Sequence, residues 1–382
     1  MNTRPTPEKT TPGLSLCMIV RDCETELACS LDSIRDFVDE MIVVDTGSRD
    51  ATREVARSRG ARVFDFTWCD SFSAARNHSL EMAEGEWIFW MDADDVLCDG
   101  GGRLLRQAIA SRPLRDAAFW VDVEQPTAGD IDQREFITHA HIKLFPSHPS
   151  IRFHGRVHEH VMEDIRKLGL AIETSKITVH HQRDSRDIDK HQNRLLRNLR
   201  LLALELDDRP EDPLVLMNLA MTQLGLPDGS QQAVAYARRA LDRLTPTSTA
   251  AINTTLVLMS AHHDLGDVAS ELRAGCDALR HAPNDSMLLW HVGHIHRRRN
   301  NLSAAIDCFQ RILNHGKLRI ALNHDRQTLE RAAVALGQLH IMQGDRLQAE
   351  SVWRAFIKAH PTSPLVLDAL EQSLLQGFRS DV

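Results

Sequence analysis

The stretch WIFWMDADD, residues 87–95, decides the fold class. Its five leading apolar residues predict a buried strand, and Asp92-Ala93-Asp94 follows directly where that strand stops. In extended backbone Asp92 and Asp94 would point to the same side, where two carboxylates can share one divalent cation. An acidic turn that caps a helix is the alternative, and Asp95 is well placed for it. The strand-end position favours a binding site.

Strand and helix patterns alternate around this stretch. Apolar runs predict strands at residues 14–20, 41–44, 62–66 and 87–91. Helical spacing separates them at residues 24–37, 50–58 and 73–83. This alternation indicates an α/β domain with a mixed, mostly parallel sheet, in which ligands bind beyond the carboxyl ends of the strands. Asp45 and Asp92 both stand at such ends, so we expect both at the site.

The second half of the chain follows a different pattern. Three more strands are predicted, at residues 119–123, 141–145 and 177–180. From about residue 190, helices follow one another with short turns, and some spacings match tetratricopeptide packing positions. These positions are Gly337, Ala349 and Trp353, and again Gly293, Ala305 and Phe309. We therefore predict a tail at residues 1–12, an α/β domain at 13–185 and an all-α, tetratricopeptide-like repeat domain at 186–382.

Composition excludes several classes of protein. The chain has 382 residues, is 42% hydrophobic and carries a net charge of -8, which argues against a nucleic-acid binder. Its seven cysteines are odd in number and none shows CxxC spacing, as expected of free thiols in a reducing compartment. The first twelve residues are polar, and no apolar run is long enough for a membrane-spanning helix. A cytoplasmic location is the resulting expectation.

Four further side chains are candidates for chemistry. The Asp45 carboxylate could accept hydrogen bonds from a uracil imide or a ribose hydroxyl, or merely form an Asx-turn with Gly47. Arg76 could contact a base or a diphosphate, or be a solvated surface residue. Glu159 is a candidate general base, or merely part of a surface loop rich in histidine. Of the adjacent His180 and His181, at most one should face the site. It could be a third ligand for manganese beside Asp94, or a structural histidine with its hydrogen bonds satisfied.

Four motifs together resemble a known family. They are LCMIVR (16–21), VVDTGS (43–48), FSAARN (72–77) and WMDADD (90–95). Their order and spacing resemble the inverting family 2 glycosyltransferases, which have the GT-A fold. The later GRVHE (155–159) and the repeats resemble the branch that adds tetratricopeptide repeats to such a domain. That branch includes the peptide S-glycosyltransferases that act on bacteriocin precursors.

The resemblance implies a role for each matching residue. The donor would be a UDP-sugar carrying a hexose, and the cation Mn²⁺ or Mg²⁺. The nucleotide-binding positions are Val20, Asp45, Arg76, Asn77 and Asp92, with Asp92 near the ribose. Asp94 would hold the metal, with His181 as a further candidate ligand. Glu159 would be the base, with His158 as the alternative. Two departures are Asp22-Cys23-Glu24 in place of Asn-Glu-Glu, and Gln182 to Asp184 in place of Tyr-Gly-Tyr after the His pair.

The sequence does not identify the acceptor. A peptide or protein thiol or hydroxyl could be presented by the repeats, and a glycan or lipid-linked saccharide fits equally. If the chain forms a homodimer, the repeat surface would be its interface. One rival is a non-catalytic tetratricopeptide scaffold with a vestigial nucleotide-sugar domain. Another is a nucleotidyltransferase, which would want a Gly-rich basic loop where residues 21–24 read RDCE.

Overall fold

A computed structural model describes residues 13–126, 136–182, 188–315 and 322–380 of the chain. The chain divides into two compact units, Met1–Arg194 and Leu195–Val382. This division lies within helix α6, Ile188–Asp208, shortly after the predicted boundary at residue 185. The predicted tail at residues 1–12 lies outside the described residues.

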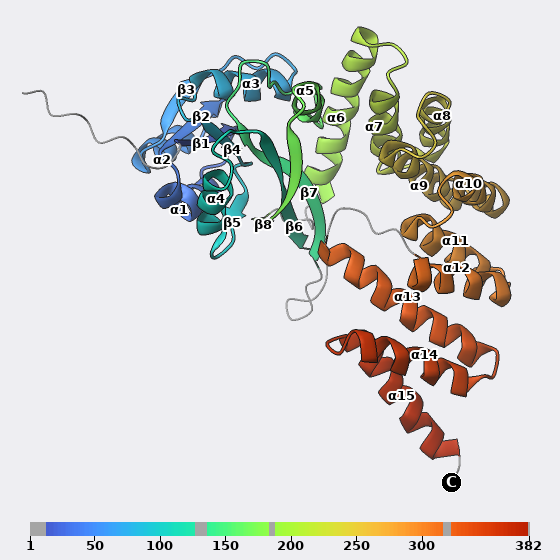
Figure 1. Ribbon diagram of the computed structural model, residues 1–382. Helices are drawn as coiled ribbons and strands as arrows, with labels where there is room; N and C mark the ends of the chain where they lie inside the picture. Colours follow the sequence, from blue (N-terminus) through green and yellow to red (C-terminus); the bar gives the residue numbers. More distant parts are fainter. Residues whose placement is uncertain (1–12, 127–135, 183–187, 316–321, 381–382) are drawn as a thin grey trace, which may run out of the picture. The chain divides into compact units, whose positions relative to one another are not determined.

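The first unit is built on one eight-stranded mixed sheet, in the order β3-β2-β1-β4-β7-β6-β8-β5 (Figure 1). The strands are β1 Leu14–Val20, β2 Glu40–Asp45, β3 Arg62–Asp65, β4 Trp87–Trp90, β5 Asp95–Leu97, β6 Ala117–Pro126, β7 Phe136–Pro146 and β8 Ala171–His181. Strands β1 to β4 pair in parallel, and β7 joins β4 antiparallel. The predicted mixed, mostly parallel sheet is confirmed. The short strand β5 was not predicted, because it has only three residues.

Helices cover both faces of this sheet (Figure 1). They are α1 Leu27–Ile34, the 3₁₀ turn η1 Arg35–Phe37, α2 Thr52–Ser58, α3 Phe72–Met82, α4 Gly101–Ala110 and α5 Met162–Lys167. Successive side chains of β1 point to opposite faces of the sheet, which explains why a helical layer packs on each face. Leu16 and Met18 point to one face and pack with α1, α2 and α4. Cys17 points the other way and packs with α3 and α5. This mostly apolar strand is therefore buried on both sides, as parallel strands usually are.

Strand register brings the candidate acids to the same edge. Cys17 of β1 pairs with Trp90 of β4, and Val20 pairs with Asp45 of β2. Asp45 is therefore level with the residues that follow β4. Since β1 lies between β2 and β4, the two strand ends are about 10 Å apart, two strand spacings.

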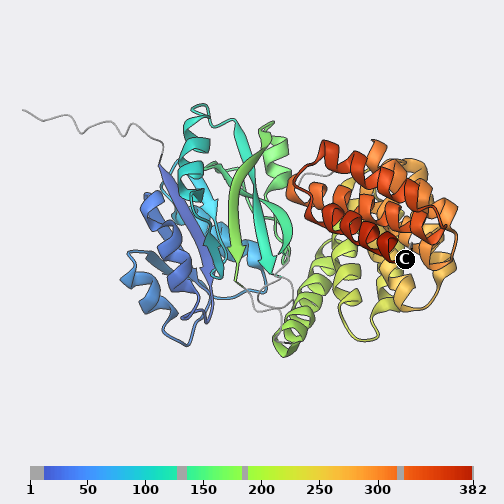
Figure 2. The same ribbon diagram turned by 90° about the horizontal axis from the view of Figure 1, so that it is seen from below.

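The second unit is all helical. Its helices after α6 are α7 Pro213–Leu224, α8 Ser230–Leu241, α9 Thr249–Asp264, α10 Val268–His281, α11 Ser286–Arg298, α12 Leu302–His315, α13 Leu322–Met342, α14 Arg346–Ala359 and α15 Pro364–Ser380. Successive helices pack against each other (Figure 2), as expected of a helical repeat. Two turns are alike: Gly266 and Gly344 have positive φ, and the Asp that follows each caps the next helix. Among the described residues, no helix has the length and apolar character needed to cross a membrane.

The predicted small and large packing positions of the repeats meet as expected. Gly337 on α13 lies against the Trp353 indole of α14, so closely that a Cβ at Gly337 would overlap the ring. Trp353 also donates a hydrogen bond of 3.1 Å to the Ala333 carbonyl. In the other copy, a Cβ at Gly293 would lie 3.0 Å from the Phe309 ring.

This packing leads to a stability prediction. We expect Gly337→Ala to destabilise the helical unit by about 1–3 kcal/mol, because the added methyl group must displace a buried indole. The measurement is thermal unfolding followed by circular dichroism. Gly266→Ala is an unsuitable control, because the positive φ of Gly266 would strain any other residue. Gly293→Ala is the better comparison: its added methyl group would meet a looser contact, so the loss of stability should be smaller. An equal cost at both sites would contradict this account.

Candidate functional site

The acidic residues after β4 form a turn, which we call the acidic turn (residues 92–95). The Asp95 backbone N donates to the Asp92 carbonyl at 3.1 Å, and the Asp95 carboxylate accepts from the Asp92 backbone N at 3.1 Å. The expectation of extended backbone through Asp94 is therefore wrong. Asp95 does not cap a helix either: it begins β5 and is fully buried.

The turn nevertheless brings its carboxylates together with one histidine. Ligand atoms of Asp92, Asp94, Asp95 and His181 all lie within 4.8 Å of one another. Strand β8 pairs antiparallel with β5 and sets His181 opposite Asp95. The His181 Nδ1 atom is 2.8 Å from Asp95 and 3.4 Å from Asp94. The neighbouring His180 turns to Glu124 instead, at 3.3 Å, so only one of the two faces the cluster.

Two buried cations hold the acidic turn. Lys143 of β7 lies 2.8 Å from the Asp95 carboxylate, and both side chains are almost fully buried. Arg76 of α3 bridges two carboxylates, at 2.6 Å from Asp92 and 2.5 Å from Glu159. Arg76 is thus no solvated surface residue. It connects the acidic turn to the segment that carries the candidate base.

These ion pairs control the ionisation of the acids. Partial burial opposes the charge on Asp92, but the Arg76 guanidinium and the Lys143 ammonium outweigh it and hold its pKa below the usual range. Burial likewise opposes the charge on Asp95, and Lys143 together with the hydrogen bond from His181 lowers its pKa. Both groups are therefore carboxylates near neutral pH, as a metal ligand or a hydrogen-bond acceptor must be.

Glu159 lies on a loop, residues 154–160, that we call the base loop. Backbone hydrogen bonds between His154 and His160, of 3.0 and 3.1 Å, close its two ends. The Asn77 amide is engaged at both ends by the Phe153 backbone, at 3.0 and 2.8 Å, so it anchors this loop to α3. His158, the alternative base, is exposed and has a φ of 57°.

The two candidates at the β1 and β2 ends have mainly structural contacts. The Asp45 carboxylate is buried, accepts from the backbone N of Ser48 at 3.1 Å and pairs with Arg53 at 2.6 Å. Its contact to Gly47 N, at 3.2 Å, is the Asx-turn considered above. Val20 is a core residue whose carbonyl accepts from Thr46. The nucleotide-binding roles of these residues stay predictions.

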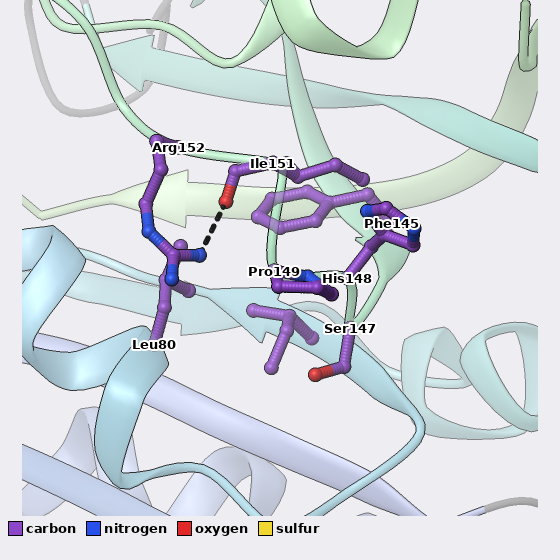
Figure 3. A pocket seen from close by; sticks show the side chains of 8 residues that line it. Leu80, Phe145, Ser147, His148, Pro149, Ile151 and Arg152 are labelled. Atoms are coloured by element: carbon purple, nitrogen blue, oxygen red, sulfur yellow. Dashed lines mark hydrogen bonds between the residues drawn. The ribbon is translucent and has the colours of Figure 1, made fainter. Parts of the chain in front are cut away.

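A pocket elsewhere in the first unit is unrelated to this chemistry (Figure 3). It is lined by Leu80, Ile88, Phe145, Ser147, His148, Pro149, Ile151 and Arg152. Ile88 is near the start of β4, whereas the acidic turn follows its end, about 13 Å further along an extended strand. The pocket therefore lies toward the opposite end of the sheet from the site.

The acidic turn suits a hard divalent cation. Asp92 and Asp94 have side chains that are 39% and 22% exposed, so their oxygens can reach a ligand from solvent, whereas that of Asp95 is fully buried. Carboxylate oxygens suit magnesium and manganese, and manganese also accepts an imidazole nitrogen. Asp95 lies 2.8 Å from His181 Nδ1 and can orient the imidazole ring, as carboxylates commonly do for metal-bound histidines.

Lys143 and Trp90 belong to the site but were not predicted as site residues from the sequence. Both cations lie on the Trp90 ring, with Arg76 Cζ at 4.2 Å and Lys143 Nζ at 3.7 Å from its centroid. For Lys143, the sequence does contain an indication. Lys143 interrupts the strand segment 141–145 with a charge, and such a residue on a central strand needs a buried partner.

Comparisons with known proteins support the resemblance. Residues 15–146 match the model of glycosyl transferase family 2. A TPR repeat-containing protein of Synechococcus elongatus is 30% identical over 307 residues, which cover 78% of this chain and 66% of that protein. The SPbeta prophage-derived glycosyltransferase SunS of Bacillus subtilis is 26% identical over 61% of this chain and 54% of its own.

Solved structures give a more distant likeness. The crystal structure of S. aureus TarS 1-349 in complex with UDP-GlcNAc has a TM-score of 0.42 and 14% identity, over 72% of this chain and 93% of that one. The chain spans between about half and two thirds of the length of the curated relatives named above. The match to the model of glycosyl transferase family 2 covers residues 15–146, and a helical repeat unit follows them in the chain.

Proposed function

We propose that this chain is a metal-dependent inverting glycosyltransferase that moves a hexose from a UDP-sugar to a peptide, protein or glycan acceptor. The observation that carries the proposal is the continuous link from Glu159 through Arg76 to Asp92. It sets a candidate base beside a cluster that can hold a cation, at the sheet edge where nucleotides bind in such domains. The match of residues 15–146 to the family supports it.

In this mechanism the acceptor attacks the sugar in one step. Glu159 takes the proton from the acceptor hydroxyl or thiol, whose oxygen or sulfur bonds to the anomeric carbon while the bond from that carbon to the diphosphate breaks. A divalent cation held by Asp94 and His181 would supply electrostatic stabilisation for the departing diphosphate. The sugar inverts because no covalent enzyme intermediate forms.

The remaining residues position these groups. Arg76 keeps Glu159 within 2.5 Å of its guanidinium and thereby aims the base loop at the acidic turn. Asn77 fixes the start of that loop through Phe153. Asp92, partly exposed beside Arg76, is our candidate for the ribose, and Asp45 for the nucleoside.

The acceptor is proposed from the resemblance to the peptide S-glycosyltransferase branch. A peptide thiol or hydroxyl presented by the helical repeats is our first choice, and a glycan is the second. Mass detection of products from a panel of UDP-hexoses, offered with a peptide library and with oligosaccharides, separates the two. The homodimer and the cytoplasmic location stay predictions.

We expect UDP together with Mn²⁺ to stabilise the protein against heat, because a ligand that binds only the folded state raises the melting temperature by mass action. At about 100 times the dissociation constant the gain is roughly 2.7 kcal/mol. A thermal-shift assay measures it, with ADP plus Mn²⁺ and UDP plus EDTA as controls. A vestigial scaffold would show no shift at millimolar UDP and Mn²⁺, and that result would contradict the proposal.

A further inference from the structure

The charges around the acidic turn form one connected network. Its carboxylates are Asp92, Asp94, Asp95 and Glu159, and its cations are Arg76 and Lys143. His181 joins Asp94 to Asp95 and must be neutral if it binds a metal. Four negative and two positive charges leave a net charge of -2. That charge is matched by one divalent cation.

Both cations are fixed rather than mobile. Trp90 lies against each of them, and its Nε1 atom donates a 2.8 Å hydrogen bond to the Ile142 carbonyl, which locks the ring. Lys143 is 1% exposed, so its ammonium has left water almost completely. A buried ion pair of this kind is often no more stabilising than apolar residues of the same size. Stability alone therefore gives little reason for a lysine at this position.

The place of Lys143 has two consequences for the cluster. Its ammonium binds Asp95 Oδ2 and leaves Oδ1 within 2.8 Å of His181 Nδ1, so Asp95 can hold the imidazole in place beside Asp94. It also neutralises the one carboxylate that is fully buried. A cluster with one more negative charge would attract a divalent cation more strongly, because Coulomb energy scales with the product of the charges.

We propose that Lys143 is a positioning residue that acts as the internal counter-charge of the metal site. It keeps Asp95 out of the coordination of the cation and thereby sets the affinity of the site for a single divalent ion. This inference rests on the divalent cation of the proposed function. It adds a residue outside the acidic turn and the base loop to the residues that control the site.

Charge-changing variants of the full chain test this inference, with Mn²⁺ alone as the probe in isothermal titration calorimetry. We expect Lys143→Met to bind Mn²⁺ on the order of tenfold more tightly, and Asp95→Asn on the order of tenfold more weakly. The double variant restores the net charge and should return to within about threefold of the wild type. Structural damage could only weaken binding, so the tightening separates the two explanations.

Two controls complete the series. Lys143→Arg keeps the charge and should keep the affinity for Mn²⁺. Lys176→Gln changes an exposed lysine of β8 and should have no effect on that affinity.

A folded Lys143→Met variant that binds Mn²⁺ no more tightly than the wild type overturns the inference. Should that variant fail to fold, the double variant decides, since it buries no unpaired charge, and a loss beyond tenfold there overturns it. If the wild type binds no Mn²⁺, the metal dependence in the proposed function is contradicted as well. If the wild type binds Mn²⁺ but the charge changes leave the affinity unaltered, only the inference about Lys143 is contradicted.

Discussion

Asp94→Asn is expected to lower sugar transfer by roughly 10²-fold or more while leaving the fold intact, because the proposed cation, which would stabilise the departing diphosphate, would lose an anionic ligand. Asp94 is partly exposed and lies 3.4 Å from His181, in a turn held by Asp95 rather than by itself. The substitution therefore removes a charge while leaving the backbone and carboxylate hydrogen bonds between Asp92 and Asp95 in place. Release of UDP in the presence of Mn²⁺ is the measurement, together with the affinity for Mn²⁺.

Asp99→Asn is the matched control for this variant. Asp99 is an exposed acid shortly after β5, close in sequence to the acidic turn but outside the cluster. We expect it to retain wild-type turnover. An Asp94→Asn variant whose turnover stays within threefold of the wild type would show that Asp94 does not hold the metal.

Glu159→Gln is expected to keep donor binding and to lose transfer by about 10²–10⁴-fold, the usual contribution of a positioned base. Glutamine keeps an oxygen that can accept from Arg76, so the base loop should stay in place. The measurement pairs UDP affinity by calorimetry with the rate of transfer to the acceptor. A variant that loses both would indicate a structural role for Glu159 instead.

His158 is the alternative candidate for the general base. It is exposed and has positive φ, a conformation that asparagine tolerates well, so His158→Asn removes the imidazole with little strain. If transfer survives in Glu159→Gln and fails in His158→Asn, the base is His158. Glu163→Gln, an exposed glutamate paired with Lys167 on α5, should leave transfer unchanged and serves as the control.

The sequence predicted the strands well where they are mostly apolar. The strands at residues 14–20 and 41–44 were found within a residue or two, because a buried parallel strand must be apolar on both faces. The strand β5 was missed because Asp95, Val96 and Leu97 are too few to show a pattern. Pairing with β8, far away in sequence, is what makes those residues a strand.

By itself, the sequence determined which acids stand at the strand ends and which glycines and aromatic residues pack in the repeats, since local patterns carry both. The contacts among these residues were decided only by the tertiary structure. Arg76 meets Asp92 and Glu159 because α3 and the base loop converge on the end of β4. Lys143 reaches Asp95 because β7 pairs with β4. Partners so distant along the chain leave no local pattern, and burial, which makes each of these charges need a partner, is a property of the folded chain.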